Sequence, residues 1–224
     1  MKKSRKFWNK EYKDSKYLAM SDNPSEDMQK FLRFVERLEG KQSLNELCKV
    51  LDLGTGNGRN IIYLAKTYGL SGVGYDISEI AVSEAKKASV GLPLKYEVKS
   101  IGESISFPDS SVTLVLDMMT SHFLSNAERK NMQQEIYRVL KPGGWLYLKT
   151  FLRTNDRHAE RLLKDAPAEE EGSYIHPEIG VPEHVFTEDD IIEELESGGF
   201  TIAKISKSHN PSKRRSMSLY VQKI

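Results

Sequence analysis

The chain has 224 residues, 38% of them hydrophobic and 29% charged, and a formal net charge of +1 at pH 7. This length and composition predict one soluble α/β domain and exclude a disordered or fibrous chain, and the small net charge argues against a strong overall attraction to nucleic acid. No apolar run reaches the roughly 18 residues of a membrane helix, no signal peptide is recognised, and the single cysteine, Cys48, fits a packed thiol in a reducing cytoplasm.

The first 40 residues combine a basic, aromatic segment with a predicted helix. Residues 1–20 hold seven Lys or Arg and two acids. They also carry the aromatic side chains Phe7, Trp8, Tyr12 and Tyr17, and we expect the last three to cover a ligand. The sequence Asn23-Pro24-Ser25-Glu26 predicts a helix with Asn23 as its N-cap and proline in the first helical position. This helix is expected to end at Gly40.

From residue 49 the pattern alternates between strands and helices. A buried strand at 49–53 leads into a loop with glycines at positions 54, 56 and 58, and a helix at about 59–68 follows, ending at Gly69. A strand at 72–76 precedes a helix that Ser78 caps and that runs to about Ala88. Glycine at alternate positions allows a tight turn and lets a ligand approach the backbone closely.

The same alternation continues as far as residue 151. Three further strands are expected, near 95–99, at 112–117 and at 145–151. Ser125 and Glu128 form a predicted capping box for a helix that ends near Leu140, and Lys141–Gly144 is expected to be a turn. Alternation of this kind predicts a parallel sheet with helices on both faces.

The remainder of the chain follows a different pattern. Residues 152–186 contain three prolines and many charges, and because the segment is too long for a simple connector, we expect it to cover a substrate. Thr187 and Asp190 predict a capped helix that ends at Gly198-Gly199. Two strands follow, at about 200–207 and 216–223. Because no helix separates them, they should pair antiparallel.

The glycine-rich loop carries the main evidence about a ligand. Its spacing is G-x-G-x-G, whereas a dinucleotide fingerprint reads G-x-G-x-x-G and cradles a pyrophosphate. Asp52 lies two residues before the first glycine, where a carboxylate would repel a phosphate but suits a positively charged ligand, such as an ammonium or a sulfonium. Asp76 closes the second strand, a position from which an acid can accept hydrogen bonds from ribose hydroxyls.

These features resemble motif I and the following motifs of the class I S-adenosylmethionine (SAM) methyltransferases. The resemblance covers roughly residues 48–151 and includes the Lys-Pro-Gly-Gly-Trp145 segment before the fifth strand. It implies a Rossmann-like, seven-stranded, mostly parallel sheet in the order 3-2-1-4-5-7-6 with an antiparallel last strand, and SAM as cofactor with S-adenosylhomocysteine as product. Within the family, Gly56–Asn60 and His184–Asp190 resemble members of the tellurite-resistance and thiopurine kind.

The resemblance also indicates which residues would bind the cofactor and meet the acceptor. The expected cofactor-binding residues are Asp52, Gly54, Thr55, Gly56, Gly58, Asn60, Asp76, Ile77, Gly102, Glu103, Asp117, Met118, Trp8 and Tyr17. The acid that usually meets the adenine amine falls at Ile101, so the chain departs from the family there. His122 is a candidate general base or acceptor ligand, and an ordinary loop histidine is the alternative. No His/Cys/Asp cluster has zinc spacing, so no metal is expected.

The sequence favours a methyltransferase that moves the sulfonium methyl group to a small molecule by in-line displacement, mainly through proximity and orientation. An RNA or protein methyltransferase is the alternative that the basic tail, with Lys213-Arg214-Arg215, would support. A SAM-binding protein without turnover is a third reading, to which Ile101 points, and the glycine spacing disfavours a nicotinamide dehydrogenase. We expect a single domain: an N-terminal lid and helix at 1–40, a cofactor-binding core at 48–151, an insertion at 152–186 and a C-terminal helix and hairpin at 187–224.

Overall fold

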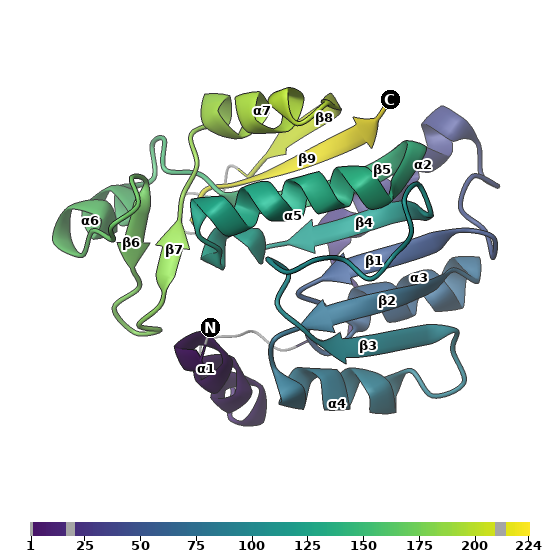
Figure 1. Cartoon of the computed structure of the whole chain (residues 1–224), viewed down its shortest axis with the longest axis horizontal. Coiled ribbons are helices and arrows are strands. Elements are labelled where there is room, and N and C mark those ends of the chain that lie inside the picture. Colours follow the sequence, from purple (N-terminus) through teal and green to yellow (C-terminus); the bar gives the residue numbers. More distant parts are fainter. Residues whose placement is uncertain (1, 17–20, 209–213) are drawn as a thin grey trace. The chain divides into compact units, whose positions relative to one another are not determined.

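The computed structural model describes residues 2–16, 21–208 and 214–224. Its main feature is a seven-stranded sheet with the order β3-β2-β1-β4-β5-β9-β8 (Figure 1). Since β8 and β9 are the sixth and seventh strands of this sheet along the chain, the predicted order 3-2-1-4-5-7-6 is confirmed. β9 (Ser216–Lys223) pairs antiparallel with both β5 (Leu140–Phe151) and β8 (Phe200–Lys207). The predicted Rossmann-like sheet with an antiparallel last strand is therefore present.

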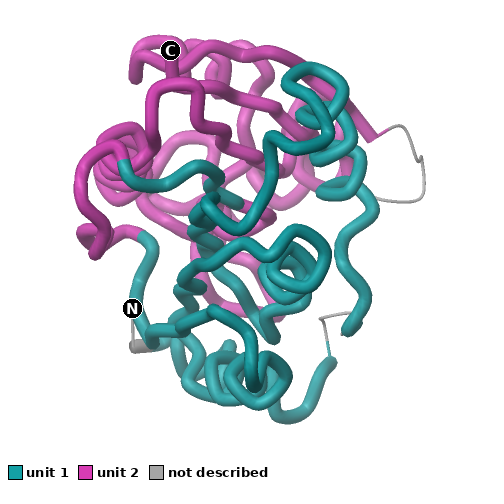
Figure 2. The backbone as a smooth tube through the Cα atoms, turned by 90° about the vertical axis from the view of Figure 1, so that its right-hand side faces the viewer, with its two compact units in different colours: residues 1–101, 111–116 teal, residues 102–110, 117–224 magenta. Residues whose placement is uncertain are grey.

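The chain divides into two compact units, coloured separately in Figure 2. Unit 1 consists of residues 1–101 and 111–116, and unit 2 of residues 102–110 and 117–224. Each unit has its own buried apolar residues, and each is described here by itself.

Unit 1 contains the first strands of the sheet and the helices between them. In chain order its elements are α1 (Lys2–Lys13), α2 (Glu26–Glu39), β1 (Lys49–Leu53), α3 (Arg59–Tyr68), β2 (Ser71–Asp76), α4 (Glu79–Ala88), β3 (Leu94–Val98) and the greater part of β4 (Val112–Met118). β2 lies between β1 and β3 and pairs parallel with both. The predicted β-α alternation is thus confirmed in this unit, and α1 packs against α4 (Figure 1).

The start of α2 differs from the prediction. Ser25, not Asn23, is the N-cap, and its side chain makes no capping hydrogen bond. The backbone N–H of Ser25 instead donates to Oδ1 of Asn60 at 2.9 Å, while the N–H of Asn23 donates to Oγ of Ser21 at 3.1 Å. The N-cap residue therefore bonds to a side chain 35 positions away in the sequence. Local capping rules cannot anticipate such a partner.

Unit 2 contains η1 (Ser121–Phe123), α5 (Asn126–Val139), β5, α6 (Arg157–Asp165), β6 (Ser173–Ile175), β7 (Pro182–His184), α7 (Glu188–Ser197), β8 and β9. Both predicted capping boxes are present: Ser125 with Glu128 before α5, and Thr187 with Asp190 before α7. Each box pairs two backbone N–H groups that would otherwise lack a partner at the helix start.

The predicted turn at Lys141–Gly144 is corrected, because β5 already begins at Leu140 and includes these residues. The segment is irregular strand: Gly143 has a φ of 77°, and its carbonyl accepts a hydrogen bond from Nε2 of Gln222 at 3.0 Å. Pairing between β5 and β9 starts only at Trp145. Glycine tolerates this positive φ, so Gly143 fits within the irregular start of β5.

The segment 152–186 has a structure of its own. Asp156 caps α6 by accepting hydrogen bonds from the N–H groups of His158 and Ala159, and β6 and β7 form a separate two-stranded antiparallel sheet. The guanidinium of Arg129 on α5, almost fully buried, forms a salt bridge with Glu170. The weak periodicity of this segment in the sequence gave no indication of these elements. Among the described residues, no helix has the length and apolar character to cross a membrane.

Lys223 supports the end of α5, which leads to a prediction about stability. Its Nζ donates to the carbonyl oxygens of Tyr137 at 2.7 Å and Leu140 at 2.9 Å, and the residue is only 9% exposed. Lys223→Met would leave these carbonyls unpaired, so we expect the free energy of unfolding to fall by about 2 kcal/mol. Urea titration followed by circular dichroism measures this. Lys87→Met, on the exposed surface of α4, is the control, and an equal loss in both variants would contradict the role of Lys223.

Candidate functional site

The glycine-rich loop between β1 and α3 is held by hydrogen bonds within unit 1. The N–H groups of Gly54 and Thr55 donate to the carbonyl of Tyr75, at 2.8 and 2.9 Å. The N–H of Gly58 donates to the carbonyl of Thr55 at 3.0 Å, and that of Gly56 to Oδ2 of Asp76 at 2.9 Å. Because these four donors are already paired, they do not form the N–H cradle that a pyrophosphate requires.

Two buried carboxylates flank this loop. Asp52, 2% exposed, accepts a hydrogen bond through Oδ2 from Oγ1 of Thr55 at 2.7 Å. Asp76, 7% exposed, accepts from the N–H of Ser78 at 2.8 Å in addition to the bond from Gly56. A carboxylate has about four acceptor positions, so Asp76 keeps capacity for hydroxyl donors. Burial raises the pKa of Asp76, and the N–H bonds from Ser78 and Gly56 oppose that rise.

Tyr12 on α1 lies directly over the loop. Gly56 has a φ of +58°, and a Cβ added there would lie 2.5 Å from the Tyr12 hydroxyl oxygen. Burial raises the pKa of Tyr12, and the negative charges of Asp76 and Asp52 raise it further. The Oδ1 of Asn9 holds α1 in place by accepting a hydrogen bond from Oγ of Ser78 at 2.8 Å.

Three other residues predicted to bind the cofactor also belong to unit 1, and their contacts differ. Asn60 is 8% exposed and uses its Oδ1 to bind Ser25, Ile77 is partly exposed next to Asp76, and Trp8 packs edge-to-face on Phe7 at 4.9 Å between ring centroids. Tyr17 lies outside the described residues. Tyr12, which the expected set of cofactor-binding residues omitted, is the aromatic residue of α1 that reaches the loop.

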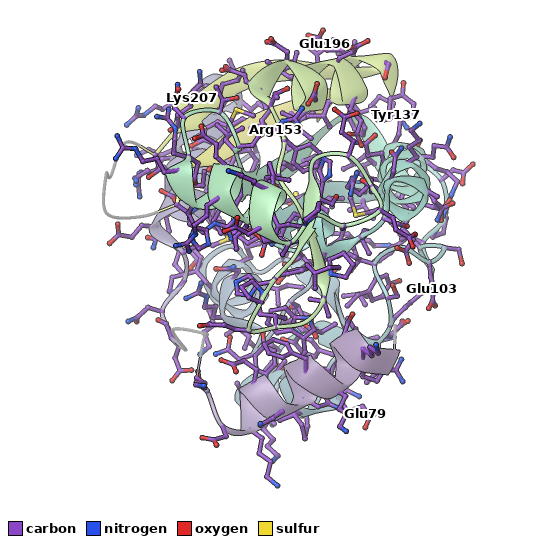
Figure 3. All side chains as sticks on the ribbon, turned by 90° about the vertical axis from the view of Figure 1, so that its left-hand side faces the viewer. Glu79, Glu103, Tyr137, Arg153, Glu196 and Lys207 are labelled. Atoms are coloured by element: carbon purple, nitrogen blue, oxygen red, sulfur yellow. The ribbon has the colours of Figure 1, made fainter. Side chains whose placement is uncertain are left out.

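Unit 2 carries the other predicted residues. The carbonyl of Gly102 accepts a hydrogen bond from Nδ2 of Asn131 at 2.9 Å, whereas Glu103 points outward and is exposed (Figure 3). Asp117 is fully buried at the end of β4 and accepts from the N–H of Ser121 at 3.2 Å. Burial raises the pKa of Asp117 to about 6. Met118 is partly exposed beside it.

His122, the predicted base or acceptor ligand, is buried on η1. Its ring packs on Phe123 and on Phe151, with centroid distances of 4.2 and 5.3 Å. Its Nδ1 is buried and has no hydrogen-bond partner among the described residues. Burial lowers the pKa of His122 to about 4. The charge of Glu183 favours the protonated ring, and the charge of Arg214 opposes it. The imidazole is therefore neutral at pH 7. The residue is only 2% exposed.

The structure thus groups the predicted residues into a loop with two acids in unit 1 and a buried histidine with a strand-end acid in unit 2. Sequence reasoning missed Tyr174 and Glu183, which with Arg214 form a buried polar cluster close to His122. Tyr174 lies on β6, Glu183 on β7 and Arg214 just before β9, so no local spacing marked them. In the part of the chain that the structure describes, no group of three or more His, Cys, Asp or Glu side chains is arranged to hold a metal ion.

A parallel sheet with a glycine-rich loop after its first strand and an acid at the end of its second defines a nucleotide-type cofactor-binding α/β protein. Comparison with known families narrows this class. The family model described as a methyltransferase domain matches residues 50–144. A SAM-dependent methyltransferase from Methanosarcina mazei has a TM-score of 0.70 at 27% identity, covering 90% of this chain and 99% of that one.

Two further matches agree with this. Arsenite methyltransferase of Aquipseudomonas alcaligenes is 32% identical over 143 residues, which cover 57% of this chain and 38% of the relative. The 1,6-didemethyltoxoflavin-N1-methyltransferase of Burkholderia thailandensis, solved with S-adenosylhomocysteine, shares the fold with a TM-score of 0.71 at 15% identity, covering 99% and 88% of the chains. Residues 50–144 therefore match a methyltransferase domain, and the chain shares its fold with SAM-dependent methyltransferases. It spans 23%, 43% and 38% of the length of three curated relatives that it matches.

The residues present fit SAM, the cofactor of this class. The buried carboxylate of Asp52 suits the ammonium or sulfonium of the methionine part, and Asp76 keeps acceptor capacity for ribose hydroxyls. The paired N–H groups of the loop suit a cofactor that has no phosphate.

Proposed function

We propose that this protein is an enzyme that transfers the methyl group of SAM to a small-molecule acceptor (EC 2.1.1.-). The observation that carries the proposal is the loop of unit 1, where Asp52 and Asp76 lie buried on either side of glycines whose N–H groups are already paired. The arsenite methyltransferase named above, whose name states a small-molecule substrate, supports an acceptor of that kind.

When bound, SAM supplies a methyl group that is already activated as an electrophile. The protein's task is then to bind and orient. We assign Asp52 to the methionine end, Asp76 to the ribose hydroxyls and Ile77 to the adenine face, with Gly54, Thr55, Gly56 and Gly58 shaping the loop. Tyr12 covers the loop from α1 and excludes water from it.

His122 is proposed to meet the acceptor, and Asp117 and Met118 at the end of β4 stay predicted cofactor contacts at the methionine portion. A histidine whose pKa is about 4 is a weak base at neutral pH. We therefore assign His122 to hydrogen bonding with the acceptor, and not to removal of a proton from it. Gly102, Glu103, Asn60 and Trp8 stay predicted cofactor contacts.

The basic tail gives little support to an RNA acceptor. Arg214 is engaged with Glu183 and Tyr174, and the N–H of Arg215 donates to Asp156 at 2.8 Å. An Arg214 side chain held in this way is not available to follow a phosphate backbone. Lys213 lies outside the described residues.

Calorimetric titration with SAM and S-adenosylhomocysteine, with NADH as the control ligand, tests the proposal. We expect micromolar binding of both adenosyl ligands and none of NADH. An acceptor screen with methyl-labelled SAM then measures transfer. Absence of adenosyl-ligand binding would refute the cofactor assignment, and binding without transfer to any acceptor would favour the non-catalytic alternative.

Tyr12 gives a prediction about cofactor release. Because its ring covers the loop at Gly56, Tyr12→Ala should remove an aromatic contact and raise the dissociation rate of S-adenosylhomocysteine about tenfold. Stopped-flow displacement measures the rate. Phe7→Ala, which changes an aromatic residue of the same helix that packs on Trp8, controls for loosening of α1, and an equal increase in both variants would contradict a specific role for Tyr12.

A further inference from the structure

A closed polar cluster in unit 2 links the insertion to the start of β9. Oε1 of Glu183 on β7 accepts the hydroxyl of Tyr174 at 2.7 Å and lies 2.5 Å from Nη1 of Arg214. Nη2 of Arg214 also donates to the Tyr174 oxygen at 2.8 Å. Glu183 is 2% exposed and Tyr174 fully buried, so the insertion brings an ion pair into the interior of the unit.

Phe151 joins this cluster to His122. The guanidinium carbon of Arg214 lies 3.5 Å from the centroid of the Phe151 ring, and the His122 ring packs edge-to-face on the same ring at 5.3 Å. β7, which carries Glu183, also packs against η1, which carries His122. The histidine and the ion pair therefore border the same small region of unit 2.

Two buried polar atoms in this region have no hydrogen-bond partner among the described residues: Nδ1 of His122 and Nε of Arg214. Buried polar groups are nearly always paired, and leaving one unpaired costs about 1–3 kcal/mol. Unpaired atoms next to an otherwise complete network point to a ligand that supplies the missing partner.

The charges of the region indicate which ligand would be accepted. Glu183 and Arg214 neutralise each other, and the pKa of His122, lowered by burial to about 4, keeps the ring uncharged at pH 7. A carboxylate or an ammonium entering here would bring a charge without a free counter-ion, which is costly away from water. A hydroxyl carries no charge, and it both donates and accepts, so it can pair with Nδ1 in either tautomer of the histidine.

We propose that His122, Phe151 and the Glu183–Arg214–Tyr174 cluster form the acceptor-binding site, and that this site takes an uncharged compound whose hydroxyl group pairs with Nδ1 of His122. The inference rests on the proposed methyltransferase function and names the substrate class for it. Glu183 acts as a positioning residue, because it neutralises Arg214 and so makes the site select against ions.

Nuclear magnetic resonance on the full chain labelled with ¹⁵N-histidine tests this, with His122→Phe to assign the ring signals. The probes are benzyl alcohol, benzoate and benzylammonium, which share the ring and differ in charge. Fragments of this size bind at about millimolar concentration. We expect benzyl alcohol to shift the His122 ring signals in a saturable way, and to bind at least tenfold more tightly than either ion.

Glu183→Gln provides a sharper test, because it keeps the size of the side chain but leaves the charge of Arg214 unpaired. The preference should then change towards benzoate, whereas Glu178→Gln, at an exposed position between β6 and β7, should leave the preference as in the wild type. If Glu183→Gln does not fold, the order of the three probes on the wild-type protein still decides the question.

Tighter binding of benzoate than of benzyl alcohol by the wild type would overturn the proposal, because the site would then prefer an anion. No saturable shift with any probe would also overturn it, and would leave Nδ1 of His122 paired with a buried water only. Titration of the same sample with S-adenosylhomocysteine separates the two levels: loss of that binding counts against the methyltransferase function, and the probe results count against the acceptor site.

Discussion

Asp76→Asn is expected to weaken binding of both S-adenosylhomocysteine and 5′-methylthioadenosine by about 100-fold, equivalent to about 2.7 kcal/mol. The physical reason is the loss of charge-assisted hydrogen bonds from two ribose hydroxyls, a group that both ligands carry. Asp52→Asn should act differently, because 5′-methylthioadenosine lacks the amino-acid end. Asp52→Asn should weaken the binding of S-adenosylhomocysteine by about tenfold or more. The binding of 5′-methylthioadenosine should stay nearly unchanged. Isothermal calorimetry with the two ligands measures both effects.

Glu97→Gln, an exposed carboxylate on β3, serves as the matched control and should bind both ligands as the wild type does. Because Asp76 also accepts hydrogen bonds from Gly56 and Ser78, the thermal stability of each variant is recorded alongside. A variant of Asp52 that lost both ligands equally would show that this acid supports the loop in general and does not bind the methionine end.

Acidification from pH 7 to pH 5 should destabilise the protein, with His122 as a principal cause. Its pKa is about 4 in the folded chain, against 6.5 in the unfolded chain. Between these values the unfolded chain binds a proton that the folded chain does not, so this contribution to stability is complete above about pH 6.5 and is lost as the pH falls towards 4. At pH 5 the loss amounts to about 2 kcal/mol.

Burial is the main cause of the lowered pKa of His122. The charged groups that also act on this pKa are Glu183, Arg214, His184 and Arg129. His184, whose pKa burial also lowers to about 4, adds a loss of the same sign. Asp117 has the opposite sign, since burial raises its pKa to about 6, so the penalty for its ionised form is relieved as the pH falls below that value.

Urea titrations at both pH values, on the wild type and on His122→Phe, isolate the histidine, because Asp117 and His184 remain in both proteins. The wild type should lose about 2 kcal/mol more than the variant between pH 7 and pH 5. Equal losses would show that His122 is not held neutral in the folded chain.

Much of the fold was predictable because its signals are local. The caps at Ser78, Ser125 and Thr187 lie in the sequence next to the apolar periodicity that they begin, and the glycine loop separates a strand from a helix. The predicted N-cap of α2 was wrong because the N–H of Ser25 donates a hydrogen bond to Asn60, which is distant in the sequence. In the segment 152–186, α6 and the β6–β7 sheet depend on tertiary partners such as Arg129 and Glu170, which no short window contains.

The candidate site divides in the same way. Asp52 and Asp76 were predictable because each has a fixed place at the end of a strand. The position of Tyr12 over the loop depends on how α1 packs on α4, and the pairing of Glu183 with Arg214 joins β7 to a residue just before β9. Contacts of this kind depend on the completed chain path and leave no pattern in the sequence.

The saturated hydrogen bonds of the glycine loop have a consequence for the cost of recognition. A loop whose N–H groups find their partners within the protein has its bound shape before any ligand arrives. Little backbone conformational entropy then remains to be lost on association, so more of the intrinsic interaction energy appears as affinity. Such a loop is a rigid template that the ligand does not have to order, and any adaptation on entry falls to side chains such as that of Tyr12.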